Sequence, residues 1–211
     1  MPEITTRLVE LISSKVCHDL ISPVGAISNG VEILEEMGAD DDVTALISFS
    51  ATQANAKLKT LRMAYGLGGS DESIKIEDIH KTFDDFISGD NRVSQNWSPS
   101  MTLSFETRKG FPKLLMCALM LVGESLPKGG KVEVKPHDEN TIVIIGRGEN
   151  ATFRQGYVDA LAQSTDVENL DPKLIHPYIT GLFAQQYGFE ITPDECGDSF
   201  ISLRLKQASV S

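Results

Sequence analysis

His18 is the residue of this sequence whose setting best suits nucleophilic chemistry, because it lies opposite the apolar side of a long amphipathic segment. At about 100° per residue, His18 falls about 200° from both Val16 and Leu20. A neutral imidazole on the polar side of a helix is free to react near pH 7. The apolar residues recur at steps of three or four, as in one helical stripe: Val9, Ile12, Val16, Leu20, Pro23, Ile27, Val31 and Leu34.

The side chains around His18 are small, with apolar residues at the border, which favours the docking of another protein over a merely solvated face. A solvated helix surface more usually carries Glu, Lys and Arg. The alternative is that His18 is one more exposed polar residue. The positions expected to form the docking surface are Leu11, Ser14, Ile21, Ser22, Gly25 and Asn29, with Leu11 and Ile21 as its apolar anchors.

Composition and charge exclude several classes of function. The chain has 211 residues, with 19 Lys and Arg against 30 Asp and Glu, for a formal net charge of −11. Nucleic acid is therefore an unexpected partner, because binding phosphates requires clustered cations. The longest uncharged apolar run, residues 114–123, is too short to span a membrane. The three cysteines lie far apart, which fits a reducing compartment, and we expect a cytoplasmic protein.

The first third of the chain is expected to form a helical hairpin. Asp40 to Asp42 should cap a second helix, and the glycines at 66–69 should end it, which divides the chain into domains 1–69 and 70–211. One hairpin cannot cover the apolar side chains that lie off its main stripes. We therefore expect a homodimer in which two hairpins form a four-helix bundle.

The remaining residues alternate between strand-like and helical segments, so an α+β domain is expected. The predicted helices are 77–88, 111–126, 154–164 and 171–187, and the predicted strands are 73–76, 93–97, 101–107, 131–136, 141–146, 189–193 and 199–205. Cys117 falls within the most apolar of these helices and is expected to be buried.

The residues from His18 to Pro23, followed by 29–34, resemble the phosphoacceptor helix of sensor histidine kinases, in which an acidic residue follows the histidine and a proline follows five residues later. The second domain resembles the kinase ATP-binding domain in outline. The positions where that resemblance expects asparagine hold Met120 and Glu124, however, and Ile145 stands where an aspartate is expected. Gly146 and Gly148 alone are a weak signal for phosphate binding.

The chain as a whole resembles the ChpT-type histidine phosphotransferases, on the residues 17–27, 124–130 and 175–182. This resemblance implies a degenerate, kinase-like α/β sandwich as the second domain and a phosphorelay without ATP. It implies His18 as phosphoacceptor between a CckA-like hybrid-kinase receiver and CtrA-like and CpdR-like response regulators. Mg²⁺ would come from the receiver domain, so no cofactor or metal is expected on this chain.

Two further residues are candidates for roles at His18. Lys15, one helical turn away, could steady phosphoryl oxygens, and Asp19 could orient the imidazole; either residue could instead be a plain surface charge. Two alternative functions stay open on the sequence. One is an ATP-dependent histidine kinase with an unusual nucleotide pocket, and the other is a non-catalytic dimeric scaffold.

Overall fold

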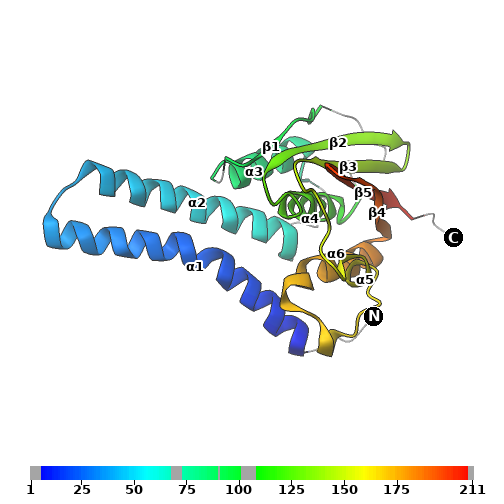
Figure 1. Ribbon diagram of the computed structural model, residues 1–211, viewed down its shortest axis with the longest axis horizontal. Helices are drawn as coiled ribbons and strands as arrows, with labels where there is room; N and C mark the ends of the chain where they lie inside the picture. The colour runs from blue at the N-terminus through cyan, green and yellow to red at the C-terminus, as the bar shows by residue number, and fades with distance from the viewer. Residues whose placement is uncertain (1–5, 68–72, 90, 101–107, 209–211) are drawn as a thin grey trace.

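A computed structural model of the chain describes residues 6–67, 73–89, 91–100 and 108–208, and it begins with a long helical hairpin. Helix α1 spans Thr6–Met37 and helix α2 spans Asp41–Tyr65. The hairpin projects from a compact C-terminal domain, and α1 changes direction beside that domain before it runs along α2 (Figure 1). The expected boundary at residues 69 and 70 lies outside the described residues.

Local chemistry sets the turn and the close packing of the hairpin. The Asp40 side chain accepts a hydrogen bond from the Val43 N–H at 3.0 Å, as the predicted cap requires. Gly30 on α1 lets α2 approach, because a Cβ atom there would lie 2.5 Å from Cγ1 of Ile47. The two helices therefore pack closely near the hairpin's outer half.

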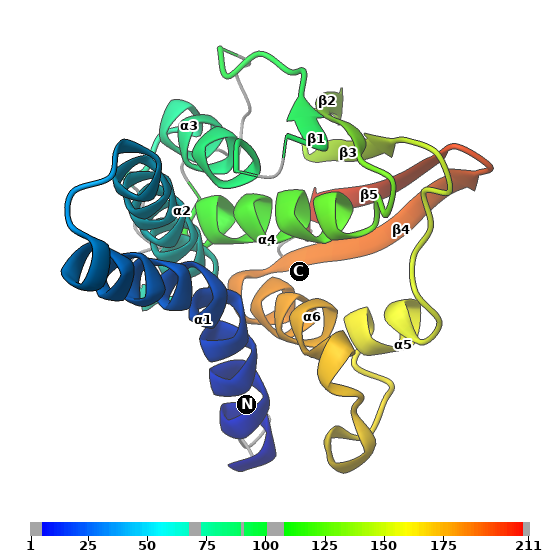
Figure 2. The ribbon, with the colours of Figure 1, turned by 60° about the vertical axis from the view of Figure 1, so that its left-hand side comes forward.

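The C-terminal domain is a five-stranded sheet in the order β1-β2-β3-β5-β4, with helices α4 and α6 against one face (Figure 2). Only β1 and β2 pair in parallel among the described strands; the other pairs are antiparallel. The strands are β1 Val93–Gln95, β2 Gly130–Asp138, β3 Thr141–Arg147, β4 Phe189–Gly197 and β5 Phe200–Gln207. The helices are α3 Ile76–Ile87, α4 Phe111–Glu124, α5 Tyr157–Leu161 and α6 Ile175–Tyr187, with the short 3₁₀ turns η2 Val167–Asn169 and η3 Pro172–Leu174.

Helix α4 forms the centre of the core, because every residue from Phe111 to Val122 is buried. One of these residues is charged: Lys113 is 2% exposed and donates from Nζ to the main-chain oxygens of Ala64 at 3.1 Å and Gly66 at 2.6 Å. These carbonyls belong to the end of α2, where a helix leaves its last oxygens unpaired. The core helix thus fixes the end of the hairpin to the second domain.

Most predicted elements form, and the differences have local causes. The predicted strands 131–136 and 141–146 are confirmed as β2 and β3, and the predicted strands 189–193 and 199–205 as β4 and β5. The predicted strand 73–76 is wrong, since Lys75 stands at the start of α3 and its main-chain N–H donates to the Asp78 carboxylate at 3.2 Å. The predicted helix 154–164 shortens to 157–161, because Gly156 takes a left-handed φ of 79° at its start. The predicted strand 101–107 lies outside the described residues.

The stripe of α1 is only partly buried in one chain. Pro23 is buried, but Val9 is 52% exposed and Val31 is 43% exposed. On α2, Leu58 is 52% exposed. The hairpin of a single chain therefore keeps apolar surface available for another partner.

Candidate functional site

His18 lies on α1 where the hairpin meets the C-terminal domain, and 86% of its side chain is exposed. Its Nδ1 atom lies 3.4 Å from Oδ1 of Asp19. If Nδ1 carries the proton and faces this carboxylate, Nε2 keeps its lone pair on the solvent side. Asp19 itself is half-buried, with 27% of its side chain exposed. The pair can therefore present a nucleophilic nitrogen to an incoming group.

A proline in the following turn leaves a carbonyl of this site without its helical donor. Pro23 has no N–H to give to the main-chain oxygen of Asp19, four residues earlier. Lys57 of α2 takes the missing donor's place, from Nζ at 3.0 Å. A hydrogen bond from α2 thus holds the backbone of α1 at Asp19.

Lys15 stands between two carboxylates rather than open to solvent. Its Nζ lies 3.2 Å from Oδ2 of Asp19 and 3.1 Å from Oε1 of Glu124 at the end of α4. Burial by itself would lower the pKa of Lys15, but the charges of Glu124 and Asp19 outweigh burial and raise it. Lys15 therefore stays charged and joins the two domains.

Glu124 is held from the other side by a buried histidine. His176 on α6 is 1% exposed, and its Nδ1 lies 3.2 Å from Oε2 of Glu124. Burial by itself would raise the pKa of Glu124, but His176 and then Lys15 lower it to about 2. The side chain is still 42% exposed, so it lies at the mouth of the interdomain cleft and not in a sealed interior.

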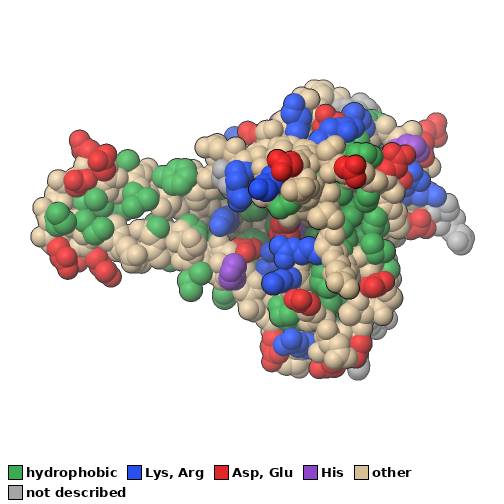
Figure 3. All heavy atoms as spheres, in the orientation of Figure 1, with side chains coloured by type: hydrophobic (Ala, Val, Ile, Leu, Met, Phe, Trp, Pro, Cys, Tyr) green, Lys and Arg blue, Asp and Glu red, His purple; other side chains and the backbone are tan. Residues whose placement is uncertain are grey.

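A groove of about 550 Å³ opens beside His18 between α1 and the C-terminal domain. Its acidic lining residues are Asp19 and Glu124, and its basic ones are Lys15, Arg154 and Lys173. Lys and Arg side chains gather where the hairpin joins the domain, whereas the far tip of the hairpin is acidic (Figure 3). We call this cavity the His18 groove.

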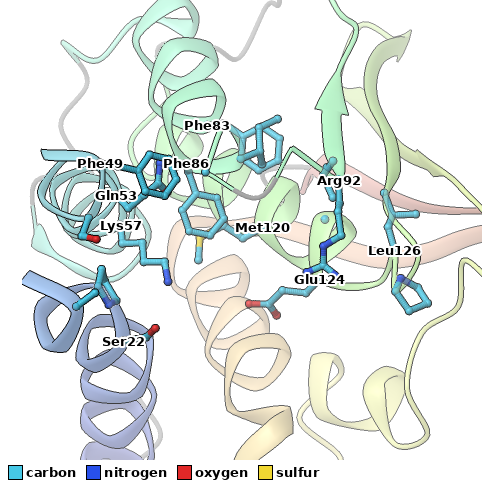
Figure 4. Close-up of a pocket in the computed structure, with 18 residues that line it drawn as sticks. Ser22, Phe49, Gln53, Lys57, Phe83, Phe86, Arg92, Met120, Glu124 and Leu126 are labelled. Atoms are coloured by element: carbon cyan, nitrogen blue, oxygen red, sulfur yellow. The ribbon is translucent and has the colours of Figure 1, made fainter. Parts of the chain in front are cut away.

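A second cavity, of about 580 Å³, lies on the other side of Glu124, between the hairpin and α3. Phe49, Phe83 and Phe86 line it together with Lys57 and Met120. Figure 4 shows the Glu124 carboxylate pointing from α4 toward the hairpin, from which Lys57 reaches inward. Glu124 therefore borders both cavities.

The structure places most of the predicted docking residues at the surface beside His18. Ile21 is 70% exposed, Ser14, Ser22 and Asn29 are exposed, and Gly25 is half-buried with nothing within 4 Å of a Cβ atom built on its backbone. Leu11 is a correction. It is 4% exposed and packs in a small cluster with Ile175 and Tyr178 of the second domain, so it cannot be an exposed anchor.

Sequence reasoning misses Glu124 and His176 as parts of the site. The sequence singles out Glu124 only because it stands where the resemblance expects asparagine, and His176 enters only as part of the range 175–182 that carries the resemblance. Lys15 and Glu124 are separated by 109 positions, so no spacing rule connects them. The sequence does offer one signal, because Glu124 follows directly after the uncharged apolar run 114–123. A carboxylate is unusual at the end of a helix that is otherwise buried.

Side chains that commonly bind metals do not cluster in the part of the chain that the structure describes. No group of three or more His, Cys, Asp or Glu side chains among the described residues is arranged to hold a metal ion. None of the described helices is both long and apolar enough to cross a membrane.

Fold and site together define a two-domain protein that exposes one histidine beside a carboxylate at the junction of a helical hairpin and an α/β domain. A family model described as the histidine phosphotransferase C-terminal domain matches residues 76–199. The chain belongs to this histidine phosphotransferase family.

Individual proteins agree with this assignment. The protein phosphotransferase ChpT of Brucella abortus (strain 2308) is 33% identical over 187 residues, which cover 86% of this chain and 87% of that protein. A solved bacterial phosphotransferase matches with a TM-score of 0.77 and 30% identity, covering 94% of this chain and 95% of the other.

Proposed function

We propose that this protein is a phosphorelay intermediate, which accepts a phosphoryl group on His18 from a receiver-domain aspartate and passes it to the aspartate of a response regulator. The observation that carries the proposal is the exposed imidazole, 86% accessible, with Nδ1 facing Asp19. A histidine that only filled space would not need this exposure. The Brucella relative carries the name of a protein phosphotransferase, which supports the same reaction class.

The transfer step follows from the geometry of the imidazole. Nε2 of His18 attacks the phosphorus of the aspartyl phosphate, the new N–P bond forms, and the P–O bond to the receiver's carboxyl group breaks. The receiver's aspartate leaves as a carboxylate, and His18 keeps its Nδ1 proton as a phosphorylated imidazolium. Asp19 stabilises that positive charge, because its Oδ1 atom faces Nδ1 at 3.4 Å. The second transfer is the reverse of this step, onto a different aspartate.

The charge on the transferred phosphoryl group needs cations, and we propose that Mg²⁺ bound to the receiver domain supplies most of them. Lys15, the expected contributor on this chain, is engaged by Asp19 and Glu124. Arg154 and Lys173 also line the His18 groove and can face an acidic surface on the receiver.

The protein is proposed to act as a homodimer through its hairpin. Val24 is 50% exposed and Val31 43% exposed on α1, while Leu58 is 52% exposed on α2. Exposed aliphatic side chains at helical spacing on both helices favour a four-helix bundle with a second copy. Such a dimer leaves His18 free for receivers, because His18 projects about 120° around α1 from Val24.

The particular partners are proposed from the family resemblance. They are the receiver of a CckA-like hybrid kinase on one side and CtrA-like and CpdR-like response regulators on the other, all in the cytoplasm.

The test is phosphotransfer between purified proteins. A phosphorylated receiver should label the wild-type chain and leave the His18→Ala chain unlabelled, while both give the same circular dichroism spectrum and melting curve. Label on His18→Ala would contradict the proposal. The alternative kinase function would instead show itself as labelling of the wild-type chain by magnesium ATP with no receiver or second kinase present.

A further inference from the structure

Four side chains form a continuous series of polar contacts from the interior of the C-terminal domain to His18. His176 Nδ1 lies 3.2 Å from Glu124 Oε2, Glu124 Oε1 lies 3.1 Å from Lys15 Nζ, and Lys15 Nζ lies 3.2 Å from Asp19 Oδ2. Asp19 then presents its other oxygen, Oδ1, to His18 Nδ1 at 3.4 Å. Each carboxylate uses one oxygen for each neighbour.

The connection is most firmly held at its inner end. His176 is 1% exposed, and its ring meets the Tyr65 ring edge-on, with centroids 5.5 Å apart and planes at 87°. Glu124 is the last residue of α4, whose preceding turns are buried in the core. Along the rest of the connection the exposed fraction is 42% for Glu124, 19% for Lys15, 27% for Asp19 and 86% for His18. The connection therefore begins at a buried ring on α6 and ends at a solvent-exposed ring on α1.

Helical geometry alone does not direct the Asp19 carboxylate toward the His18 ring. Consecutive residues of a helix project about 100° apart, so their side chains do not naturally meet. The Asp19 carboxylate reaches His18 only in a rotamer that turns one oxygen toward the ring. Lys15, bound to the other oxygen, favours that rotamer, and Glu124 keeps Lys15 in place.

We infer that Glu124 is a positioning residue for phosphotransfer: anchored by His176, it holds Lys15 so that the Asp19 carboxylate keeps the His18 ring with Nδ1 protonated and Nε2 free to attack. The inference rests on the proposed function, since it assigns the second domain a part in that reaction. Glu124 acts through Lys15 and Asp19 and touches neither the phosphoryl group nor the receiver's aspartate.

The experiment compares the wild-type chain with Glu124→Ala, Glu124→Gln, Lys15→Ala and the double variant that combines Lys15→Ala with Glu124→Ala. The first measurement is the nitrogen chemical shifts of the His18 ring in ¹⁵N-histidine-labelled protein, which report which nitrogen carries the proton. The second is the rate at which phosphoramidate, a small donor that releases ammonia, phosphorylates His18 without any receiver. The matched control is Asp194→Ala, which removes an ion pair with Arg204 in the same domain and far from the hairpin.

We expect Glu124→Ala to shift the His18 ring away from the Nδ1-protonated form and to slow phosphorylation by about tenfold, the effect of losing one charge-assisted hydrogen bond. Glu124→Gln, which keeps an oxygen for Lys15, should lose less. Lys15→Ala should match Glu124→Ala, and the double variant should lose no more than either one, because the two residues act in series.

Opposite results overturn the inference. A folded Glu124→Ala chain with unchanged ring shifts and a wild-type rate would make the Glu124 interactions purely structural. If Glu124→Ala does not fold, Glu124→Gln and Lys15→Ala decide. If both keep the wild-type rate and the wild-type ring shifts, the inference is overturned in the same way. Failure of the proposed function looks different: the wild-type chain itself would then not accept phosphate on His18, whatever Glu124 is.

Discussion

Lys57 on α2 donates from its ammonium group to the main-chain oxygen of Asp19 on α1, at 3.0 Å. That oxygen is the one that Pro23 deprives of its helical N–H partner. Lys57 of α2 thus supplies the hydrogen-bond donor that Pro23 removes from α1, next to His18. The bend of α1 and the tie to α2 therefore depend on each other.

Replacing Lys57 with Met should remove this tie while keeping the length of the side chain. We expect a loss of about 1.5 kcal/mol in the free energy of unfolding, because a carbonyl loses a charged donor. The same change in a Pro23→Ala background should cost less, since an alanine at this position supplies the missing N–H. Urea unfolding of the four proteins at one protein concentration measures this coupling. Equal losses in both backgrounds would show that Lys57 and Pro23 act independently.

Glu124 should make the stability of the chain depend on pH in the acid range. Its folded pKa is about 2, below the ordinary value of 4.5, so its contribution is complete above pH 4.5 and is lost as the pH falls toward 2. Wild type should therefore be more stable than Glu124→Gln at neutral pH, and the difference should shrink as the pH falls to about 3. Because the side chain is 42% exposed, water screens its ion pairs and the difference is small. A difference in unfolding free energy that stays constant from neutral to acid pH would contradict this prediction.

A large side chain at Gly25 should obstruct the receiver without disturbing the chain itself. No atom lies within 4 Å of a Cβ atom built there, so Gly25→Arg fits the folded monomer. We expect transfer from a phosphorylated receiver to slow by about tenfold, while phosphorylation by phosphoramidate is unchanged. Ala45→Arg, at an exposed position near the tip of the hairpin, is the matched control. Wild-type transfer rates to Gly25→Arg from every cognate receiver would place the docking surface elsewhere.

A charge on the exposed apolar side of the hairpin should separate the proposed dimer. Leu58 is 52% exposed in the single chain, so Leu58→Glu removes little internal packing. Light scattering should give twice the chain mass for wild type at micromolar concentration and the single chain mass for Leu58→Glu. A wild-type protein that is already monomeric under these conditions would end the dimer proposal.

The three cysteines should differ sharply in reactivity. Cys117 is completely buried, and burial raises the pKa of its thiol to about 12, whereas Cys17 and Cys196 are exposed. A maleimide reagent should therefore modify two thiols in the native chain and a third only after unfolding in urea. Mass spectrometry of the labelled peptides identifies them; rapid native labelling of Cys117 would mean that α4 opens readily.

The sequence is sufficient for the elements whose signals are local. The caps and apolar periodicity of 6–65 predict the hairpin, and alternation with turn residues predicts β2 and β3. The strand predicted at 73–76 is wrong because the Asp78 carboxylate accepts from the Lys75 N–H and starts a helix there. The sequence does not show why residues 146 and 148 are glycines, because the reason is tertiary packing. A Cβ atom at Gly146 would lie 2.7 Å from Cγ1 of Val122, and one at Gly148 would lie 2.3 Å from the main-chain oxygen of Gly129.

Only the part of the site that lies on α1 is predictable from the sequence. His18, Lys15 and Asp19 share α1, so helical geometry groups them. Leu11 looks equally accessible on that helix, yet the second domain covers it, and no pattern within 6–37 could reveal this. Glu124 and His176 reach the site through tertiary contacts alone.

The buried ammonium of Lys113 has a consequence for motion between the two halves of the molecule. It holds the main-chain oxygens of Ala64 and Gly66, and burial lowers its pKa, so breaking these bonds would leave a costly group unsatisfied inside the core. The last turn of α2 therefore moves with α4 as one body. Any rotation of the C-terminal domain has to bend the hairpin itself, and the junction after Tyr65 cannot serve as a free pivot.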